Sequence, residues 1–511
     1  MSRSIFSSYK KLMNRTKDLI VLSSAKAIIH WDMETKMPPK ALEQRSQQLA
    51  LLSRIRHKMS TAQEIGTLLS TICKSPQYDA LDELEKRNVY LIKKNYEEQT
   101  AMPEKLVAEI AKQKAITIDA WKKAKKAKNF SEFQPELEKL VALSKQAAQI
   151  LMQVKETATP YDALLDIYEP KMTADAITAT FNQLQQGLIT LLEKIQNNYK
   201  KIDTDILHIR VPVEKQRKIA HLLTQEIGYD TNSPKAAGRI DETEHPFTSG
   251  YYDDVRITTH YYPNNYASAI FSVLHETGHA LYEQNLNPNW KYQPVGSPCS
   301  FGIHESQSRL YENIIGRSKD FWTFTLPKLK RIAAPALANI SLSQFLHAIN
   351  KVKPSKIRIE ADEVTYNLHV IIRFQIEKDL FTNKIAVAEL PEIWNNKYKD
   401  QLATKVENDA EGVMQDTHWA SGLYGYFPTY ALGNIYSGQL LTILARDIQD
   451  WRLRIAQGKL KEIGIWLAKN VHSYGNLYTP ADLIERITGK KLDSESYLQY
   501  LREKYGELYG F

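Results

Sequence analysis

The sequence predicts a mainly α-helical protein with a small β-sheet. Glycine and proline number only 20 each among 511 residues, and this scarcity favours helix over sheet. Long stretches such as 99–153 are rich in Ala, Glu, Lys, Leu and Gln, which are typical of helices. One short segment, 254–261, alternates polar and apolar side chains in the manner of a strand.

The elements are expected in a simple order along the chain. Residues 1–205 read as a series of helices separated by short turns. Segment 229–250 is rich in Gly, Pro, Asp, Asn and Ser, so we expect a loop there, followed by the strand. A helix is expected from 361 to about 379, with further helices up to the C-terminus.

Composition and charge narrow the class of protein. The net charge of +8, from 67 basic and 59 acidic residues, is a mild bias for this length and weak evidence for nucleic-acid binding. The basic run Lys122–Lys128 is best explained as a solvated helix face, the alternative being a phosphate-binding stripe. Two distant cysteines imply no disulfide framework. Because the N-terminus lacks an apolar signal region and no run approaches the ~20 apolar residues of a membrane span, we expect a soluble, cytoplasmic protein.

An HExxH motif at residues 275–279 carries the strongest chemical signal. In a helix, His275 and His279 lie one turn apart on the same face, where both rings can bind one metal ion. Glu276 stands beside them, able to reach a metal-bound water without being a ligand. Phe271 and Leu274 give the helix an apolar side to bury. The pattern favours a zinc hydrolase.

A third ligand is expected on the next helix, because catalytic zinc usually takes three protein ligands and one water. Residues 303–316 read as an amphipathic helix, separated from the first by the Pro- and Asn-rich loop 287–298. Glu305 is the preferred ligand, and His304 is the rival one position away. Taken alone, Glu305 and Glu312 are equally consistent with solvated carboxylates.

Further stretches carry a family resemblance, in the same order along the chain. They are His30–Pro39, His245–Phe247, Asp254–Thr258, Ile357–Asp362, Gly412–Trp419 and Tyr500–Gly510. With HETGH and HESQSRLYEN, this set resembles the thermostable carboxypeptidase family, the metallocarboxypeptidases typified by carboxypeptidase Taq. The resemblance spans the whole chain. It implies a helical zincin-like metallopeptidase with a small β-sheet beside a deep central cleft.

The resemblance also implies roles for residues outside the metal site. The arginine of the IRxxAD motif, Arg358 here, is expected to bind the C-terminal carboxylate of the substrate, with Arg256 as second candidate. Similarity to helical zinc peptidases suggests that Tyr430 and His418 lie near the reacting carbonyl. His245 is expected on the cleft wall.

Two further groups of polar residues have alternative explanations. Asp254, Arg256, Thr258 and His260 share one face of the predicted strand. If the strand is an edge strand that binds an extended peptide, this face orders the substrate or its neighbours. The alternative is a half-exposed strand whose polar face is hydrated. Asp362, Tyr366, His369 and Arg373 form a stripe at helical spacing, which either lines a cleft or makes a surface ion-pair ladder.

The predicted activity is the release of single C-terminal residues from peptides, with Glu276 as general base. One alternative is an oligoendopeptidase or dipeptidyl carboxypeptidase of similar helical fold. Another is a non-catalytic, metal-containing binding protein, although the presence of Glu276 counts against it.

The expected cofactor is one Zn²⁺ per chain, with Co²⁺ as a possible substitute. The expected partners are a peptide with a free C-terminal carboxylate and, by resemblance, a second copy in a homodimer; neither nucleic acid nor membrane is expected. We expect a single domain over 1–511. Its parts are an N-terminal helical part (1–205), a metal-site and substrate-cleft part (206–440) and a C-terminal helical part (441–511).

Overall fold

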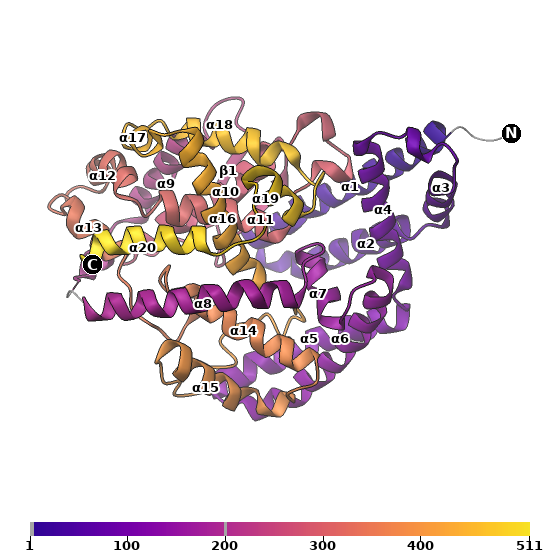
Figure 1. Ribbon diagram of the computed structural model, residues 1–511, viewed down its shortest axis with the longest axis horizontal. Helices are drawn as coiled ribbons and strands as arrows, with labels where there is room; N and C mark the ends of the chain where they lie inside the picture. Colours follow the sequence, from indigo (N-terminus) through magenta and orange to yellow (C-terminus); the bar gives the residue numbers. More distant parts are fainter. Residues whose placement is uncertain (1–4, 199–201) are drawn as a thin grey trace.

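Helices dominate the computed structural model, which describes residues 5–198 and 202–511 (Figure 1). The first eight are α1 (Ile5–Thr35), α2 (Leu42–Ser60), α3 (Gln63–Cys73), α4 (Glu83–Ala101), α5 (Glu104–Ala127), α6 (Gln134–Lys155), α7 (Pro160–Tyr168) and α8 (Ala174–Asn197). The middle of the chain forms α9 (Val213–Ile227), β1 (Gly238–Glu242), β2 (Thr248–Tyr251), β3 (Asp254–Thr259), α10 (Tyr266–Gln284), α11 (Phe301–Arg309), α12 (Lys319–Ala333), α13 (Leu342–Ile349), α14 (Tyr366–Phe381) and α15 (Leu390–Leu402). The rest forms α16 (Pro428–Asp447), α17 (Trp451–Ala456), α18 (Leu460–Asn470), α19 (Pro480–Thr488) and α20 (Glu495–Tyr509).

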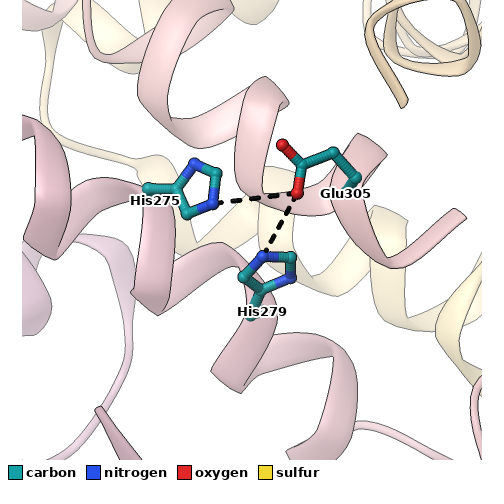
Figure 2. Close-up of side chains that lie close together, drawn as sticks. All are labelled: His275, His279 and Glu305. Atoms are coloured by element: carbon teal, nitrogen blue, oxygen red, sulfur yellow. Dashed lines mark ion pairs between the residues drawn. The ribbon is translucent and has the colours of Figure 1, made fainter. Parts of the chain in front are cut away.

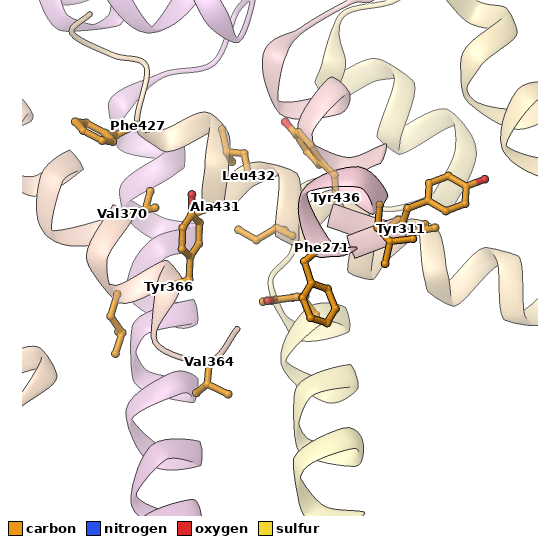
Figure 3. Packing of buried hydrophobic residues seen from close by; sticks show 14 of the residues in the cluster. Phe271, Tyr311, Val364, Tyr366, Val370, Phe427, Ala431, Leu432 and Tyr436 are labelled. Atoms are coloured by element: carbon orange, nitrogen blue, oxygen red, sulfur yellow. The ribbon is translucent and has the colours of Figure 1, made fainter. Parts of the chain in front are cut away.

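The helical fold class with a small sheet is confirmed. In Figure 1, α1–α4 lie together on one side, and α8 runs beneath α20 across the molecule. A large hydrophobic core draws buried residues from Ala124 to Tyr509, among them Leu184, Leu274 and Leu498. A smaller apolar cluster, including Leu12 and Leu69, belongs to α1, α3 and α4. Figure 3 shows part of the large core, where side chains of α10, α14 and α16 meet.

The sheet corrects two expectations. Segment 229–250 is not a continuous loop, because it contains β1 and the start of β2. The glycines that suggested a loop instead permit a tight turn: Gly250 has φ +148°, and a Cβ there would lie 2.1 Å from the Asp254 carbonyl oxygen. The strand order is β1-β3-β2, so β3 is central and β2 is an edge strand among the described residues. The strand of the DVRIT motif is therefore not the edge that we expected, and it ends at Thr259.

Two helices near the site also differ from expectation. The helix after the IRxxAD motif begins at Tyr366 rather than Ala361, because residues 363–365 form a turn in which the Asp362 side chain accepts hydrogen bonds from the Val364 and Thr365 amides. In the helix 303–316, the stretch Leu310–Ile315 is a π-helix, a local rearrangement that simple periodicity does not predict.

Close helix packing brings α11 between α10 and α16. A Cβ at Gly278 of α10 would lie 2.4 Å from the Gln307 carbonyl oxygen of α11. On the other side, a Cβ at Gly433 of α16 would lie 2.6 Å from Cγ of Glu305. Only glycine fits at either position, so both glycines set how closely the three helices approach.

Two simpler expectations can be compared with the structure. Cys73 is exposed and Cys299 is buried, and both are free thiols, as expected. Within residues 5–198 and 202–511, no helix has both the length and the apolar character needed to cross a membrane.

Candidate active site

Three predicted ligands converge at the contact between α10 and α11 (Figure 2). Nε2 of His275 lies 3.8 Å from Oε2 of Glu305, and Nε2 of His279 lies 3.5 Å from the same oxygen. The His275 and His279 side chains retain 19% and 16% of their exposure, so the site is open to solvent on one side. One ligand atom from each residue can be chosen so that all three lie within 4.8 Å of one another.

This arrangement fits a divalent metal ion. Bonds of about 2.0–2.2 Å in tetrahedral geometry separate two ligand atoms by roughly 3.3 Å, close to the spacings of 3.5 and 3.8 Å found here. Two imidazole nitrogens and one carboxylate oxygen form a donor set common in catalytic zinc sites. The three residues can therefore hold a metal with small adjustments of their side chains.

Glu312 orients the first histidine. Its Oε2 lies 2.8 Å from Nδ1 of His275, so Nδ1 is expected to carry the proton and Nε2 is free to bind a metal. Burial lowers the pKa of His275, but the carboxylates of Glu305 and Glu312 raise it more, to a net value above the ordinary one. Glu312 is thus a partner of the metal site rather than a solvated carboxylate.

His304, the rival ligand, supports the second histidine instead. Nδ1 of His304 lies 2.5 Å from Nδ1 of His279, and its Nε2 lies 3.0 Å from Glu283. If Nε2–H of His304 donates to Glu283, then Nδ1 of His304 accepts from His279. Nε2 of His279 is then left for a metal. Burial lowers the pKa of His279 to about 3, which favours the neutral imidazole that metals bind.

Arg309 fixes the carboxylate ligand. Its Nε donates to Oε1 of Glu305 at 2.6 Å and its Nη1 to Glu312 at 3.1 Å. With Oε1 held, Oε2 is the oxygen that faces the histidines. Burial raises the pKa of Glu305, but Arg309 and the two histidines lower it further, to a net value well below the ordinary one. We did not predict a role for Arg309, although its position one turn after Glu305 gives a signal for it.

The sheet positions Glu276. Oγ1 of Thr248, on the edge strand β2, donates to Oε2 of Glu276 at 2.6 Å and lies 3.0 Å from its carbonyl oxygen. Glu276 is only 6% exposed, and burial raises the pKa of its carboxyl group. A carboxylate with a raised pKa beside a metal site is suited to accept and return a proton.

Glu169 holds the start of the ligand-bearing helix α11. It is buried and accepts hydrogen bonds from Ser300 Oγ, the Gly302 amide and the Tyr436 hydroxyl, at 3.1, 3.0 and 2.8 Å. Burial raises the pKa of Glu169 to about 7, against the effect of these donors. A carboxylate at the N-terminus of α11 also interacts favourably with the helix dipole.

A second polar cluster surrounds Arg358, which is 6% exposed. Nε and Nη2 of Arg358 both donate to Oδ1 of Asp416, at 3.2 and 2.8 Å, and Nη1 donates to the Tyr366 hydroxyl at 3.1 Å. Arg373 donates from Nε to Oδ2 of Asp416 at 2.7 Å. Within the described residues, these bonds use three of the five N–H donors of Arg358 and leave two for another acceptor.

The predicted polar stripe of Tyr366, His369 and Arg373 is not an ion-pair ladder on the surface of the protein. His369 and Arg373 are completely buried, and Tyr366 is 7% exposed. Arg373 pairs with Asp416 rather than with a neighbour on its own helix. Asp362 lies before the helix and accepts a hydrogen bond from the amide of Thr365 in the preceding turn.

The loop that carries Asp416 is anchored by α5 and α14. On α5, Trp121 Nε1 and Lys125 Nζ donate to the carbonyl oxygens of Met414 and Gln415, at 2.9 and 2.8 Å. On α14, buried Glu377 accepts from Trp419 Nε1 at 2.7 Å and from a loop amide, that of Gly425, at 2.8 Å. Lys125 is thus the exception in the basic run 122–128, which we expected to be solvated. The local sequence contains no pattern that predicts its contact with the loop.

His418 and Tyr430 lie together beside this cluster. Nε2 of His418 is 3.2 Å from the Tyr430 hydroxyl, and the guanidinium of Arg358 is 5.1 Å from the Tyr430 ring. Burial lowers the pKa of His418 to about 4, so its ring is neutral near pH 7. Tyr430 is one helical turn before Gly433, which contacts the ligand Glu305. Helix α16 therefore connects the two clusters.

The remaining predicted residues lie elsewhere. Arg256 pairs with Asp254 at 2.7 Å, and its guanidinium stacks on Trp31 of α1 at 4.4 Å. These contacts dock α1 on the sheet. His245 is exposed in the connection between β1 and β2. Among the described residues, no hydrogen bond, ion pair or ring contact links these three residues directly to His275, His279 or Glu305.

Comparisons with known proteins agree on one family. Residues 11–505 match the sequence profile of the carboxypeptidase Taq (M32) metallopeptidases. The chain is 39% identical to thermostable carboxypeptidase 1 of Thermus thermophilus, over 98% of this chain and 99% of that one. It is also 39% identical to carboxypeptidase 1 of Bacillus subtilis, over 98% of each chain. The M32 carboxypeptidase of Deinococcus radiodurans R1 has a crystal structure that superposes with a TM-score of 0.93, at 34% identity over 99% of this chain and 100% of that one.

A match over nearly the whole chain, at this identity and with the same fold, establishes the family. The chain belongs to the carboxypeptidase Taq (M32) metallopeptidase family and is a metallocarboxypeptidase.

Proposed function

We propose that this metallocarboxypeptidase is zinc-dependent and removes one C-terminal residue at a time from peptides. The observation that carries the proposal is the pairing of two clusters. A His275–His279–Glu305 triad with Glu276 beside it can support hydrolysis. A nearly buried Arg358 with two N–H donors still available can bind a carboxylate.

The metal would be held by Nε2 of His275, Nε2 of His279 and Oε2 of Glu305. When bound, a zinc ion supplies a Lewis acid that lowers the pKa of water to about 7 and polarises a carbonyl group. Cobalt is compatible with the same donors. Glu312, His304 and Arg309 fix the orientation of the ligands, so little reorganisation is needed on metal binding.

Glu276 is proposed as the general base. It takes a proton from the attacking water and returns it to the amine that leaves. Thr248 holds one of its carboxylate oxygens, which limits the rotation of the side chain. The burial-raised pKa of Glu276 makes the first half of this cycle, uptake of the proton from water, easier than for an ordinary glutamate.

Tyr430 is proposed to stabilise the oxyanion that forms at the attacked carbonyl. Its hydroxyl is a hydrogen-bond donor, because burial raises the pKa of Tyr430 well above the ordinary value and keeps it protonated. Nε2 of neutral His418 lies 3.2 Å from that hydroxyl, and an Nε2–H that donates to it would leave the hydroxyl's own proton for the oxyanion. Both residues adjoin the Arg358 cluster, which is where the last residue of a peptide would lie.

Arg358 is proposed to bind the terminal carboxylate. Asp416 and Tyr366 hold the guanidinium from two sides, and the two remaining N–H groups can donate to the two oxygens of a carboxylate. Asp416 is itself shared with Arg373, so the cluster of two arginines and one aspartate keeps a net positive charge. This charge favours a peptide with a free C-terminus.

The test compares one peptide that bears a free C-terminal carboxylate with its C-terminal amide. Each is incubated with the zinc-loaded or cobalt-loaded protein, and the products are followed by mass spectrometry. Stepwise loss of single residues from the free acid alone is the expected result. Internal cleavage of both peptides would instead indicate an endopeptidase, and no cleavage with metal bound would indicate a binding protein. The homodimer and the cytoplasmic location remain predictions.

A further inference from the structure

We propose that Tyr366 is a specificity-determining positioning residue, a rigid spacer that fixes Arg358 at one distance from the metal ligands. The inference rests on the proposed function, because it assumes that Arg358 binds the terminal carboxylate. It goes further by naming the residue that makes the enzyme release one residue rather than two.

The first observation is that Tyr366 contacts both clusters. Its hydroxyl accepts a hydrogen bond from Nη1 of Arg358 at 3.1 Å. Its ring lies under the guanidinium of Arg309, which is 4.4 Å from the ring centroid. Arg309 in turn holds Oε1 of Glu305 at 2.6 Å. A chain of three contacts therefore links the metal ligand Glu305 to Arg358.

Each contact in this chain resists displacement. The Arg309 side chain is only 12% exposed and is shared between two carboxylates, so its guanidinium is held in place over the Tyr366 ring. The Tyr366 side chain is rigid beyond Cβ, and its only freedom is rotation about the Cα–Cβ and Cβ–Cγ bonds. The distance between Arg309 over the ring and Arg358 at the hydroxyl is therefore set by the ring itself. Figure 3 shows the Tyr366 ring in the core where α14 and α16 meet, which limits its rotation as well.

The backbone beneath Tyr366 is also held. Tyr366 is the first residue of α14, and its amide donates to the Asp362 carbonyl oxygen at 2.9 Å. The Asp362 carboxylate accepts from the Thr365 and Val364 amides, both at 3.0 Å, and from the Lys353 amide, also at 3.0 Å. The spacer therefore starts from a hydrogen-bonded turn and not from a free loop.

Arg358 depends on this spacer because the other hydrogen bonds of its guanidinium lie on one edge only. Nε and Nη2 both donate to a single oxygen of Asp416, an arrangement about which a guanidinium can pivot. The Tyr366 hydroxyl holds Nη1 and blocks the pivot. Without it, we expect Arg358 to move between several positions.

The consequence concerns which peptide bond reaches the metal. One residue of extended peptide spans about 3.3–3.6 Å, so a guanidinium displaced by a similar amount would accept a peptide shifted by one residue. A shifted peptide presents its second-last peptide bond, and hydrolysis then releases a dipeptide. With Arg358 held by Tyr366, single residues are released.

The test is Tyr366→Phe, which removes the hydroxyl and keeps the ring. Tyr311→Phe is the matched control, because Tyr311 is also buried and its hydroxyl has no hydrogen-bond partner among the described residues. With the zinc-loaded proteins and the free-acid peptide, we expect KM of Tyr366→Phe to rise about tenfold, in line with the loss of a hydrogen bond to a charged group, while kcat changes less than twofold. Dipeptide should appear among the products. The control should match the wild type in both respects.

A binding measurement separates this role from a general loss of structure. With the metal-free proteins, calorimetry should give a Kd for the free-acid peptide that is about tenfold weaker in Tyr366→Phe than in the wild type or the control. Metal content and thermal midpoint should be the same in all three. An unchanged KM, an unchanged Kd and only single-residue products from Tyr366→Phe would overturn the inference. If instead the wild type cleaves free acid and amide equally, the proposed role of Arg358 fails, and the inference fails with it.

Discussion

The region of the metal ligands around His275 and the proposed carboxylate-binding region around Arg358 differ in how charge is arranged. In the metal region, the carboxylates of Glu276, Glu305 and Glu312 outnumber Arg309, so without a metal the region attracts cations. In the other region, two arginines share the single carboxylate of Asp416, so the region attracts anions. This contrast is what the proposed function requires, a metal cation in one region and the terminal carboxylate of a peptide in the other.

The two regions also differ in how the chain builds them. The metal region comes from one stretch of the sequence, residues 275–312, folded into two adjacent helices. The carboxylate-binding region is assembled from α5, the segment before α14, α14 itself, the loop after α15 and α16. Variants of the first region should therefore change turnover or metal binding, and variants of the second should change which substrates bind.

The largest expected effect is that of Glu276→Gln. Loss of the general base should lower kcat by about 10³-fold, because an amide cannot take the proton from water. The zinc content, measured by atomic absorption, should equal that of the wild type, since Glu276 is not a ligand. Retention of near-wild-type kcat would mean that another group takes the proton.

Next in size is Arg358→Met. We expect kcat/KM for a free-acid peptide to fall about 100-fold, mainly through KM, because a charged pair of hydrogen bonds to the carboxylate is lost. Arg256→Met is the control, since Arg256 is paired with Asp254 and stacked on Trp31. Its steady-state KM should change less than twofold. The reverse outcome, a large increase in KM for Arg256→Met only, would indicate that Arg256 on the sheet binds the carboxylate and that Arg358 does not.

Glu312→Gln should weaken metal binding more than it affects chemistry. Glu312 accepts from Nδ1 of His275, and partners of this kind contribute about 10–100-fold to metal affinity. A zinc titration against a competing chelator measures the change, and kcat at saturating zinc should stay within a few-fold of the wild type. Glu360→Gln, at an exposed position, serves as control. Equal zinc affinity of the two variants would refute the role of Glu312.

The smallest effect is expected from Lys125→Met. This lysine donates one hydrogen bond to the Gln415 carbonyl next to Asp416, and Trp121 holds the same loop independently. We expect KM for the free-acid peptide to rise about threefold, with kcat unchanged. Lys126→Met, at the exposed neighbour in the same basic run, should have no effect. Identical KM values for the two variants would show that α5 does not position the loop.

The difference in how the chain builds the two regions also explains which parts of the site could be predicted from the sequence. His275 and His279 are four residues apart on one helix, and Glu305 lies on the next helix, so helical periodicity and ligand chemistry were enough to bring them together. The role of Arg358 was inferred by resemblance, because the spacing of Arg358 and Asp416 in the sequence says nothing about their contact.

Other features could not be predicted for physical reasons. Strands β1 and β2 are short, and each contains a glycine, Gly238 packed against Tyr229 and Gly250 at the turn into β3, so their composition resembles a loop. The stripe of Tyr366, His369 and Arg373 is polar yet buried, and only tertiary partners make such burial favourable. Lys125 contacts a loop 290 residues away, and no local pattern distinguishes it from its exposed neighbours.

The most direct test is a crystal structure of the zinc-loaded Glu276→Gln protein with a free-acid peptide bound. We predict that the terminal carboxylate lies on the two available N–H groups of Arg358, with the last peptide carbonyl facing His275, His279 and Glu305. A terminal carboxylate bound elsewhere, or an internal peptide bond at the metal ligands, would contradict the account.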